Sequence, residues 1–204
     1  KMKLTSQIIS TLLSPLLVPV YGVALAFWCS MLAVAPLGVR LRLTVVAFII
    51  TCLMPVLVIF LLHKLGIVKD RQLNDRTERT LPYIAVALSY AGCAWTLWNA
   101  NAPSWLWLFM AGGVAAVIVN IVVNRCWKIS AHLAAMGGLV ALVCRIAVEN
   151  LALASVNYLA VVSVVVIAAG LVGSARIYLG RHSLMQVFAG ALNGFLCVYF
   201  ITAL

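Results

Sequence analysis

The chain consists of long apolar runs separated by short polar segments, and this alternation constrains its fold more than any other feature. The runs cover residues 8–34, 43–63, 82–98, 104–123, 131–148, 157–174 and 184–203. A helix needs roughly 20 apolar residues to cross a hydrocarbon core of about 30 Å. With 66% hydrophobic and 9% charged residues, the 204 positions leave no room for a sizeable extramembrane domain. We therefore predict an all-α bundle of six or seven transmembrane helices that forms one domain over residues 1–204.

Local features predict departures from seven simple spans. Pro15 and Pro19 predict a break at the start of the first run, and Pro55 predicts a kink in the second. Gly190 and Gly194 have the spacing that permits close helix approach. Tryptophans surround the turn near residue 100 and predict an aromatic belt at one membrane interface. The belt would consist of Trp95, Trp98, Trp105 and Trp107.

The chain is strongly basic, with 14 Lys and Arg against 4 Asp and Glu and a formal net charge of +10. If seven spans alternate in direction, segments 64–81, 124–130 and 175–183 lie on the same side as the N-terminus. These segments hold nine of the basic residues, and Lys1 and Lys3 add two more. The positive charge is therefore concentrated on one side of the predicted bundle.

Two interpretations of this charge remain open from spacing alone. The positive-inside rule explains it without a ligand and would place this side in the cytoplasm. Each basic segment also leads into a predicted helix N-terminus, which favours phosphate or carboxylate, so a phosphate site explains it equally well. In so apolar a chain we do not expect a nucleic-acid partner.

The six cysteines are dispersed, and no two of them form a CxxC pair. Most lie inside apolar runs, where cysteine acts as a small core residue. We therefore predict neither a disulfide nor a metal site, and no cofactor.

One motif favours the phosphate site. In the segment ARIYLGRHSLMQVFAG, Arg176 is followed by five residues, His182, three residues and Gln186. This resembles the third signature of the type-2 phosphatidic acid phosphatase superfamily (lipid phosphate phosphatases), which reads Ser-Arg, five residues, His, three residues, Asp. The segment Ile-Ser-Ala-His, with Ser130 and His132, resembles the second signature, Pro-Ser-Gly-His.

The first signature of that family is Lys, six residues, Arg-Pro. Lys69 and Arg76 have this spacing, with Thr77 in place of the proline, and Arg79 with Pro82 offers a second register. The three blocks occur in the family's order, each on the basic side. The resemblance implies a phosphatidic acid phosphatase/haloperoxidase-like core over about residues 69–204.

The resemblance also implies metal-independent hydrolysis of a phosphate ester through a phosphohistidine. His182 would be the nucleophile, His132 would protonate the leaving oxygen, and Gln186 would hold the His182 ring. The implied phosphate ligands are Lys69, Arg76, Arg79, Ser130, the backbone N–H near Ala131, and Arg176. Ser130 is also well placed as an N-cap.

The chain departs from the family at three positions. Gln186 replaces an aspartate, so it can accept an imidazole N–H but offers no negative charge to a developing imidazolium. Ala175 replaces a serine, and Ala131 replaces a glycine. These changes keep two alternatives open: a catalytically impaired relative that binds or moves anionic lipid, and a small transporter with an anion site at broken helix ends.

We predict an integral protein of a bacterial plasma (inner) membrane that hydrolyses a phosphate or diphosphate monoester of a lipid. The substrate would arrive sideways from the bilayer, because the chain has almost no extramembrane mass. The candidates are phosphatidic acid, phosphatidylglycerophosphate, undecaprenyl diphosphate and a lipid A phosphate. The side that holds the site stays open, because some of the basic residues counted for topology are themselves predicted phosphate ligands.

Overall fold

Helices make up most of the chain, as the apolar runs predict. The computed structural model describes residues 2–68 and 77–204. The elements are α1 (Met2–Leu12), α2 (Val18–Cys29), the 3-10 turn η1 (Met31–Val34), α3 (Leu37–Phe48), the π-helical turn η2 (Ile49–Leu53), α4 (Met54–Lys64), the 3-10 turn η3 (Thr77–Arg79), α5 (Thr80–Asn99), α6 (Ser104–Asn124), α7 (Ala131–Val148), α8 (Tyr158–Tyr178) and α9 (Leu184–Ile201).

Six helices in the described ranges are long and apolar enough to cross a membrane. They are the continuous span Leu37–Lys64, which joins α3 and α4, and helices α5 to α9. The chain is therefore an all-helical, multi-pass membrane protein. Large apolar side chains on the outside of the bundle agree with this, since Leu88 is 69% exposed and Ile167 is 62% exposed. Such a surface is stable against lipid tails but not against water.

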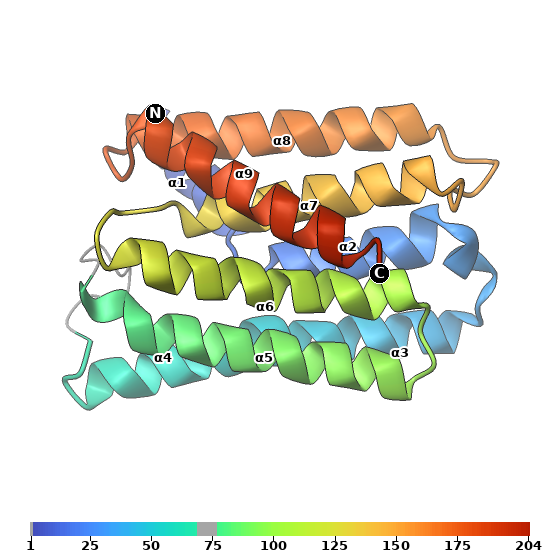
Figure 1. The fold of residues 1–204 in the computed structure, drawn as a ribbon, viewed down its shortest axis with the longest axis horizontal. Coiled ribbons are helices and arrows are strands. Elements are labelled where there is room, and N and C mark those ends of the chain that lie inside the picture. The colour runs from blue at the N-terminus through green and yellow to red at the C-terminus, as the bar shows by residue number, and fades with distance from the viewer. Residues whose placement is uncertain (1, 69–76) are drawn as a thin grey trace.

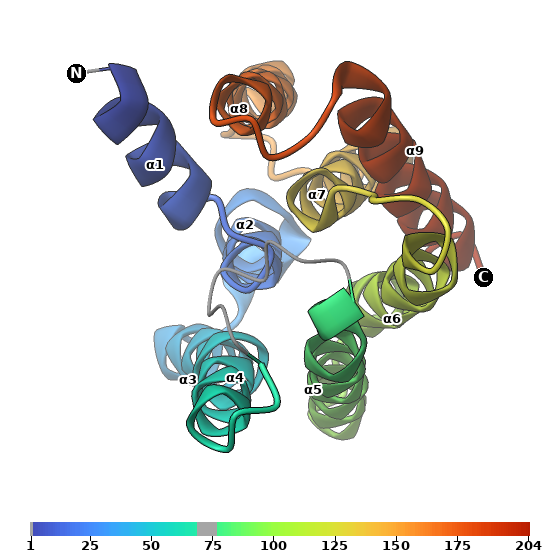
Figure 2. The same cartoon turned by 90° about the vertical axis from the view of Figure 1, so that its left-hand side faces the viewer.

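The first apolar run does not form a seventh simple span. It divides at Pro15 into α1 and α2, because proline lacks an N–H and disfavours helical geometry at the residue before it. The 12 residues of α2 cover about 18 Å at 1.5 Å per residue, which is less than the hydrocarbon core. In Figure 2, α1 is seen from the side whereas α5, α6 and α7 are seen nearly end-on, so α1 lies across one end of the bundle.

The predicted irregularity at Pro55 takes the form of a π-helical turn. The turn η2 ends at Leu53, and Pro55 lies in the first turn of α4. A proline there removes one backbone donor, and the wider turn accommodates the change while the span continues.

Helix α7 lies at the centre, between α2, α6, α8 and α9 (Figure 2). Glycines let α9 approach it closely. A Cβ on Gly194 would overlap the Ala134 carbonyl of α7, and a Cβ on Gly190 would overlap the Ser130 carbonyl. The close approach predicted from the Gly190 and Gly194 spacing is confirmed.

The predicted aromatic belt is correct only in part. Trp95 and Trp98 are 63% and 52% exposed near the end of α5, with ring centroids 5.1 Å apart. Trp105 is buried at 8% exposure and belongs to the hydrophobic core. The first turn of α6 faces the bundle interior there, so the prediction for Trp105 was wrong.

The helix ends lie at two opposite ends of the bundle, and the segments predicted to share a side with the N-terminus can be compared with this arrangement. In Figure 1 the N-terminal end of the chain, the end of α4, the α6–α7 loop and the α8–α9 loop lie at the left. The α2–α3, α5–α6 and α7–α8 connections lie at the right with the C-terminus. The described parts of the basic segments therefore lie at one end of the bundle.

Candidate active site

Helices α5, α7 and α9 begin at this basic end, and hydrogen bonds join their first residues. Arg79, the N-cap of α5, places Nη1 3.5 Å from the carbonyl oxygen of Ile129. The backbone N–H of Ser130 donates to the carbonyl of Gln186 over 3.3 Å. Three segments that are far apart in the sequence are thereby fixed next to one another. Each helix start also contributes backbone N–H groups and the positive end of a dipole.

Ser130 caps α7, as predicted. Its Oγ accepts from the backbone N–H of Leu133 at 3.5 Å, and the residue is fully buried. The close approach of Gly190 to its carbonyl adds to this burial. The structure thus gives Ser130 a capping role, and its contact with phosphate stays a prediction.

His182 and Gln186 are hydrogen-bonded, with Nδ1 and Oε1 3.2 Å apart. The same Oε1 accepts from the backbone N–H of Ser183 at 3.2 Å in a capping box at the start of α9. Because the Ser183 N–H is a donor, the shared atom of Gln186 is the amide oxygen, and His182 must donate to it from Nδ1. In the neutral ring, Nε2 of His182 then carries the lone pair.

His182 is held in its neutral form. It is 7% exposed, and burial together with the nearby charges of Arg176 and Arg79 lowers its pKa to about 3. The hydrogen bond to Gln186 opposes part of this shift, and Lys128 adds to it. A neutral imidazole with a lone pair on Nε2 is a competent nucleophile near pH 7.

Arg176 lies in the last turn of α8 and supplies a half-buried cation to the same place. Its Nη1 donates to the Oγ of Ser10 at 3.0 Å. Its Nε is buried and has no hydrogen-bond partner among the residues that the structure describes. A buried donor without a partner is unusual, and a charge that is partly removed from water favours an opposite charge beside it. A phosphate group would satisfy both needs, because guanidinium binds it through two parallel hydrogen bonds.

His132, the second residue of α7, contacts Ser10 of α1. Its Nε2 lies 3.1 Å from the Ser10 carbonyl oxygen and 3.3 Å from the Ser10 Oγ. The charges of Arg176, Arg79 and His182 act on the His132 ring, so the four side chains share one region. The structure therefore brings together His132, His182, Arg176 and Arg79, which the sequence motifs named separately.

Ser10 was missed by the sequence reasoning. It lies in none of the three motifs and is followed along the chain by a helix break. Its only sequence signal is a hydroxyl within an apolar run. The nearby hydroxyl residues Thr5, Ser6 and Thr11 carry the same signal, so it could not single out Ser10.

The structure describes only some of the remaining predicted phosphate ligands. Ala131 begins α7, where its backbone lies next to the site. Lys69 and Arg76 lie outside the described residues, so their part in the site stays a prediction. Arg79, the alternative register of the first block, is described, and it is 5% exposed.

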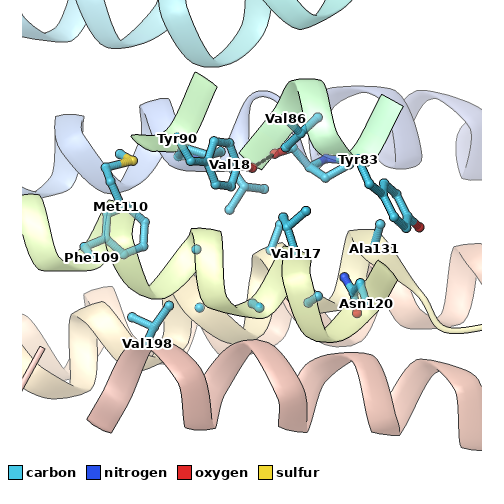
Figure 3. A pocket seen from close by; sticks show the side chains of 17 residues that line it. Val18, Tyr83, Val86, Tyr90, Phe109, Met110, Val117, Asn120, Ala131 and Val198 are labelled. Atoms are coloured by element: carbon cyan, nitrogen blue, oxygen red, sulfur yellow. Dashed lines mark hydrogen bonds between the residues drawn. The ribbon is translucent and has the colours of Figure 1, made fainter. Parts of the chain in front are cut away.

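An apolar cavity of about 70 Å³ extends from this site into the bundle. Figure 3 shows Tyr83 and Ala131 at one end of the cavity, and Phe109 and Met110 at the other. Tyr90 lines the middle and donates from its hydroxyl to the Pro15 carbonyl at 2.6 Å.

A second apolar space is an open groove of about 580 Å³ along α2, α7 and α8. It begins at Leu13, three residues after Ser10, and continues past Met136 and Ala168. A hydrocarbon chain in this groove would have its polar end near Ser10 and Arg176.

Comparison with protein-family models places the C-terminal part of the chain in a known group. The model of the PAP2 superfamily matches residues 124–204. Comparisons with curated proteins and with solved structures gave no match. The matched range includes His132, His182 and Arg176. It begins after the first predicted signature. PAP2 proteins are typically metal-independent phosphatases. A match to this superfamily therefore implies a substrate that bears a phosphate group. Residues 124–204 are therefore a PAP2 superfamily domain within an all-helical membrane bundle.

Proposed function

We propose that this protein hydrolyses a phosphate or diphosphate monoester carried by a membrane lipid, with His182 as the nucleophile. The observation that carries the proposal is the convergence of His182, His132 and the half-buried Arg176 at one end of a membrane bundle. Arg176 supports phosphate binding, since its Nε is buried without a partner among the described residues. His182 supports nucleophilic attack, since its Nδ1–H is engaged by Gln186.

In the first step, Nε2 of His182 attacks phosphorus, and the bond between phosphorus and the lipid oxygen breaks. The pair of electrons in that bond leaves with the lipid oxygen, which takes a proton from His132. The Ser10 carbonyl accepts from Nε2–H of His132, so the transferred proton is the one on Nδ1. His132 therefore enters this step as the imidazolium and leaves it as the neutral ring, still protonated on Nε2. The product of this step is a phosphohistidine and a lipid alcohol, or a lipid monophosphate when the substrate is a diphosphate.

In the second step, water attacks the phosphohistidine. His132 accepts a proton from the water, the N–P bond breaks, and inorganic phosphate leaves. Arg176 and Arg79 stabilise the negative charge on the phosphoryl oxygens in both steps, which is the main requirement of phosphoryl transfer. Lys69 and Arg76 would add to this stabilisation.

The apolar spaces beside the site support a lipid as the carrier of the phosphate. The groove along α2, α7 and α8 is open on the outside of the bundle and lined by apolar side chains. A lipid could therefore place its tail there without leaving the bilayer. A soluble phosphate ester would gain nothing from such a groove.

A phosphate-release assay tests the proposal. Purified full-length protein in detergent is incubated with phosphatidic acid, phosphatidylglycerophosphate, undecaprenyl diphosphate or a lipid A phosphate, in the presence of EDTA. We expect release of inorganic phosphate from at least one lipid, and its loss in His182→Ala. His63→Ala is the matched control, because the His63 ring bonds to the Val68 carbonyl at the end of α4. No release from any lipid, with His182→Ala equal to the parent, would refute hydrolysis.

The replacement of the family's aspartate by Gln186 favours a second candidate function. Without a carboxylate beside His182, the site would bind anionic lipid and turn it over slowly or not at all. Binding of a lipid phosphate to the parent protein without phosphate release would support this alternative.

We also propose a location in a bacterial plasma (inner) membrane, and the side of the site can be measured with a native residue. Cys126 is exposed in the loop between α6 and α7, at the end of the bundle that holds the site. Labelling of intact cells with a membrane-impermeant maleimide, with Cys126→Ser as control, reports whether this end faces outward.

A further inference from the structure

Helix α1 lies outside residues 124–204, yet one of its residues reaches the candidate active site. Ser10 is 7% exposed, whereas its neighbour Thr11 is exposed. The Oγ of Ser10 accepts from Nη1 of Arg176 at 3.0 Å, and its carbonyl oxygen lies 3.1 Å from Nε2 of His132. A single residue of α1 thus contacts both the phosphate-binding arginine and the acid histidine.

The side chain and the backbone of Ser10 both take part, and its Oγ also lies 3.3 Å from Nε2 of His132. A carbonyl oxygen can only accept, so it fixes a proton on Nε2 of His132. The hydroxyl of Ser10 accepts from Arg176, which leaves its own proton able to donate to a further oxygen. A phosphoryl oxygen bound to Arg176 would lie within reach of that proton.

Ala175 explains why a hydroxyl from another helix matters here. The residue immediately before Arg176 is a buried alanine at 4% exposure, where the resembled signature has a serine, so position 175 supplies no hydroxyl. Ser10 brings one from α1, 166 positions away in the sequence.

We propose that Ser10 is a positioning residue of the phosphate site, whose hydroxyl orients the Arg176 guanidinium and whose carbonyl orients the His132 ring. This inference rests on the proposed function, because it assumes that Arg176 binds a phosphoryl group. It extends the site beyond the PAP2 domain to the amphipathic helix that lies across the end of the bundle.

The test is the substitution Ser10→Ala, which removes the hydroxyl and keeps the carbonyl. Alanine is the strongest helix former, so α1 should persist. Binding of orthovanadate and of inorganic phosphate to the full-length protein in detergent is measured by thermal shift, with KM and kcat for a lipid phosphate measured alongside. We expect about tenfold weaker vanadate binding and about a tenfold higher KM, with kcat changed less, since an oriented guanidinium serves ground state and transition state alike.

Two further variants distinguish a role of Ser10 in positioning Arg176 and His132 from an effect on the stability of the folded protein. Ser10→Thr keeps the hydroxyl and should restore binding to near the parent value. Thr11→Ala is the matched control, because the Thr11 hydroxyl donates to the Gln7 carbonyl of its own helix at 2.9 Å on an exposed face. The unfolding temperature without vanadate should be the same in all four proteins.

The outcomes distinguish this inference from the proposed function. If the parent releases no phosphate from any lipid but binds vanadate, and Ser10→Ala weakens that binding, hydrolysis fails and the role of Ser10 stands. If the parent hydrolyses lipid phosphate and Ser10→Ala binds vanadate equally or more tightly, the role of Ser10 is overturned and hydrolysis stands. Tighter binding would mean that Ser10 competes with the phosphate. A parent that binds neither vanadate nor phosphate and releases no phosphate from any lipid would overturn both.

Discussion

His182 donates from Nδ1 to the Oε1 of Gln186 over 3.2 Å, and this oxygen also accepts from the backbone of Ser183. The contact reproduces the orientation of a His–Asp pair without its charge. Nε2 of His182 is thereby directed away from α9, while the imidazolium that forms on attack has no carboxylate to stabilise it. This relationship leads to the first two predictions.

Gln186→Asp should increase the rate of phosphate release by about tenfold or more, which corresponds to about 1.4 kcal/mol of activation free energy. The reason is that a carboxylate stabilises the positive charge that His182 acquires during attack. The measurement is kcat for the best lipid phosphate. Gln186→Leu is the control and should decrease kcat, because it removes the acceptor for Nδ1–H. An unchanged kcat in Gln186→Asp would show that this position does not limit the reaction.

The pH dependence follows from the low pKa of His182. His182 attacks as the neutral ring, and burial with the charges of Arg176 and Arg79 lowers its pKa to about 3. A lowered pKa extends the neutral form to more acidic solution, so kcat/KM should not fall as the pH decreases from 7 to 5. In Gln186→Asp the carboxylate raises the His182 pKa, and the acid limb should move to higher pH. A parent profile with an acid limb near pH 6.5 would contradict the prediction.

Gly190→Ala should destabilise the protein by about 1–3 kcal/mol, in the range of overpacked cores. The added methyl group would overlap the Ser130 carbonyl and push α9 away from α7. Phosphate release should fall as well, because Ser130 and Gln186 are joined across the same contact. Gly170→Ala is the matched control, since no atom lies within 4 Å of the added Cβ. Thermal unfolding in detergent distinguishes the two, and equal midpoints would disprove the packing argument.

Arg145 should contribute to stability without affecting the site. It donates to Glu149 at 3.0 Å and to the Tyr199 carbonyl at 2.7 Å, and its guanidinium lies 4.5 Å from the Tyr199 ring centroid. Arg145→Met should destabilise by about 2–3 kcal/mol through loss of the charged hydrogen bond and the cation–π contact. Glu149→Gln should cost about 1 kcal/mol or less, because the Glu149 side chain is 52% exposed. Unfolding midpoints check both values, and KM should stay constant in both variants.

Ala168→Trp should discriminate between long and short lipid substrates. Ala168 lines the groove along α2, α7 and α8, so an indole there would occupy the space proposed for a lipid tail. KM should rise several-fold for a long-chain phosphatidic acid and stay unchanged for the dioctanoyl form. Leu88→Trp, on the exposed face of α5, is the control and should alter neither value. Equal effects on both chain lengths would argue against the groove as the tail site.

Local chemistry made part of this structure predictable. Apolar runs of membrane-spanning length determined the helices from α5 to α9, because each backbone polar group in a bilayer must be satisfied within its own helix. The break at Pro15, the irregularity at Pro55 and the capping by Ser130 follow from properties of the residues themselves. The pair Arg145 and Glu149 follows from helical spacing.

The composition of the site was predictable only where a motif keeps its residues at fixed spacing. Arg176, His182 and Gln186 lie within one helical hairpin, so their proximity is largely local. The burial of Trp105, by contrast, depends on which face of α6 meets the bundle, and hydropathy alone does not give that face.

The sequence by itself determined that the chain spans a membrane, that its charge lies at one end, and that Arg176 and His182 belong together. Only the tertiary structure decided that Ser10 completes this group. The reason is physical: the contact between Ser10 and Arg176 joins helices 166 positions apart. The contact depends on the angle between α1 and α2 at the break around Pro15, and on the close packing of α7 and α9. Both are properties of the assembled bundle rather than of any single segment.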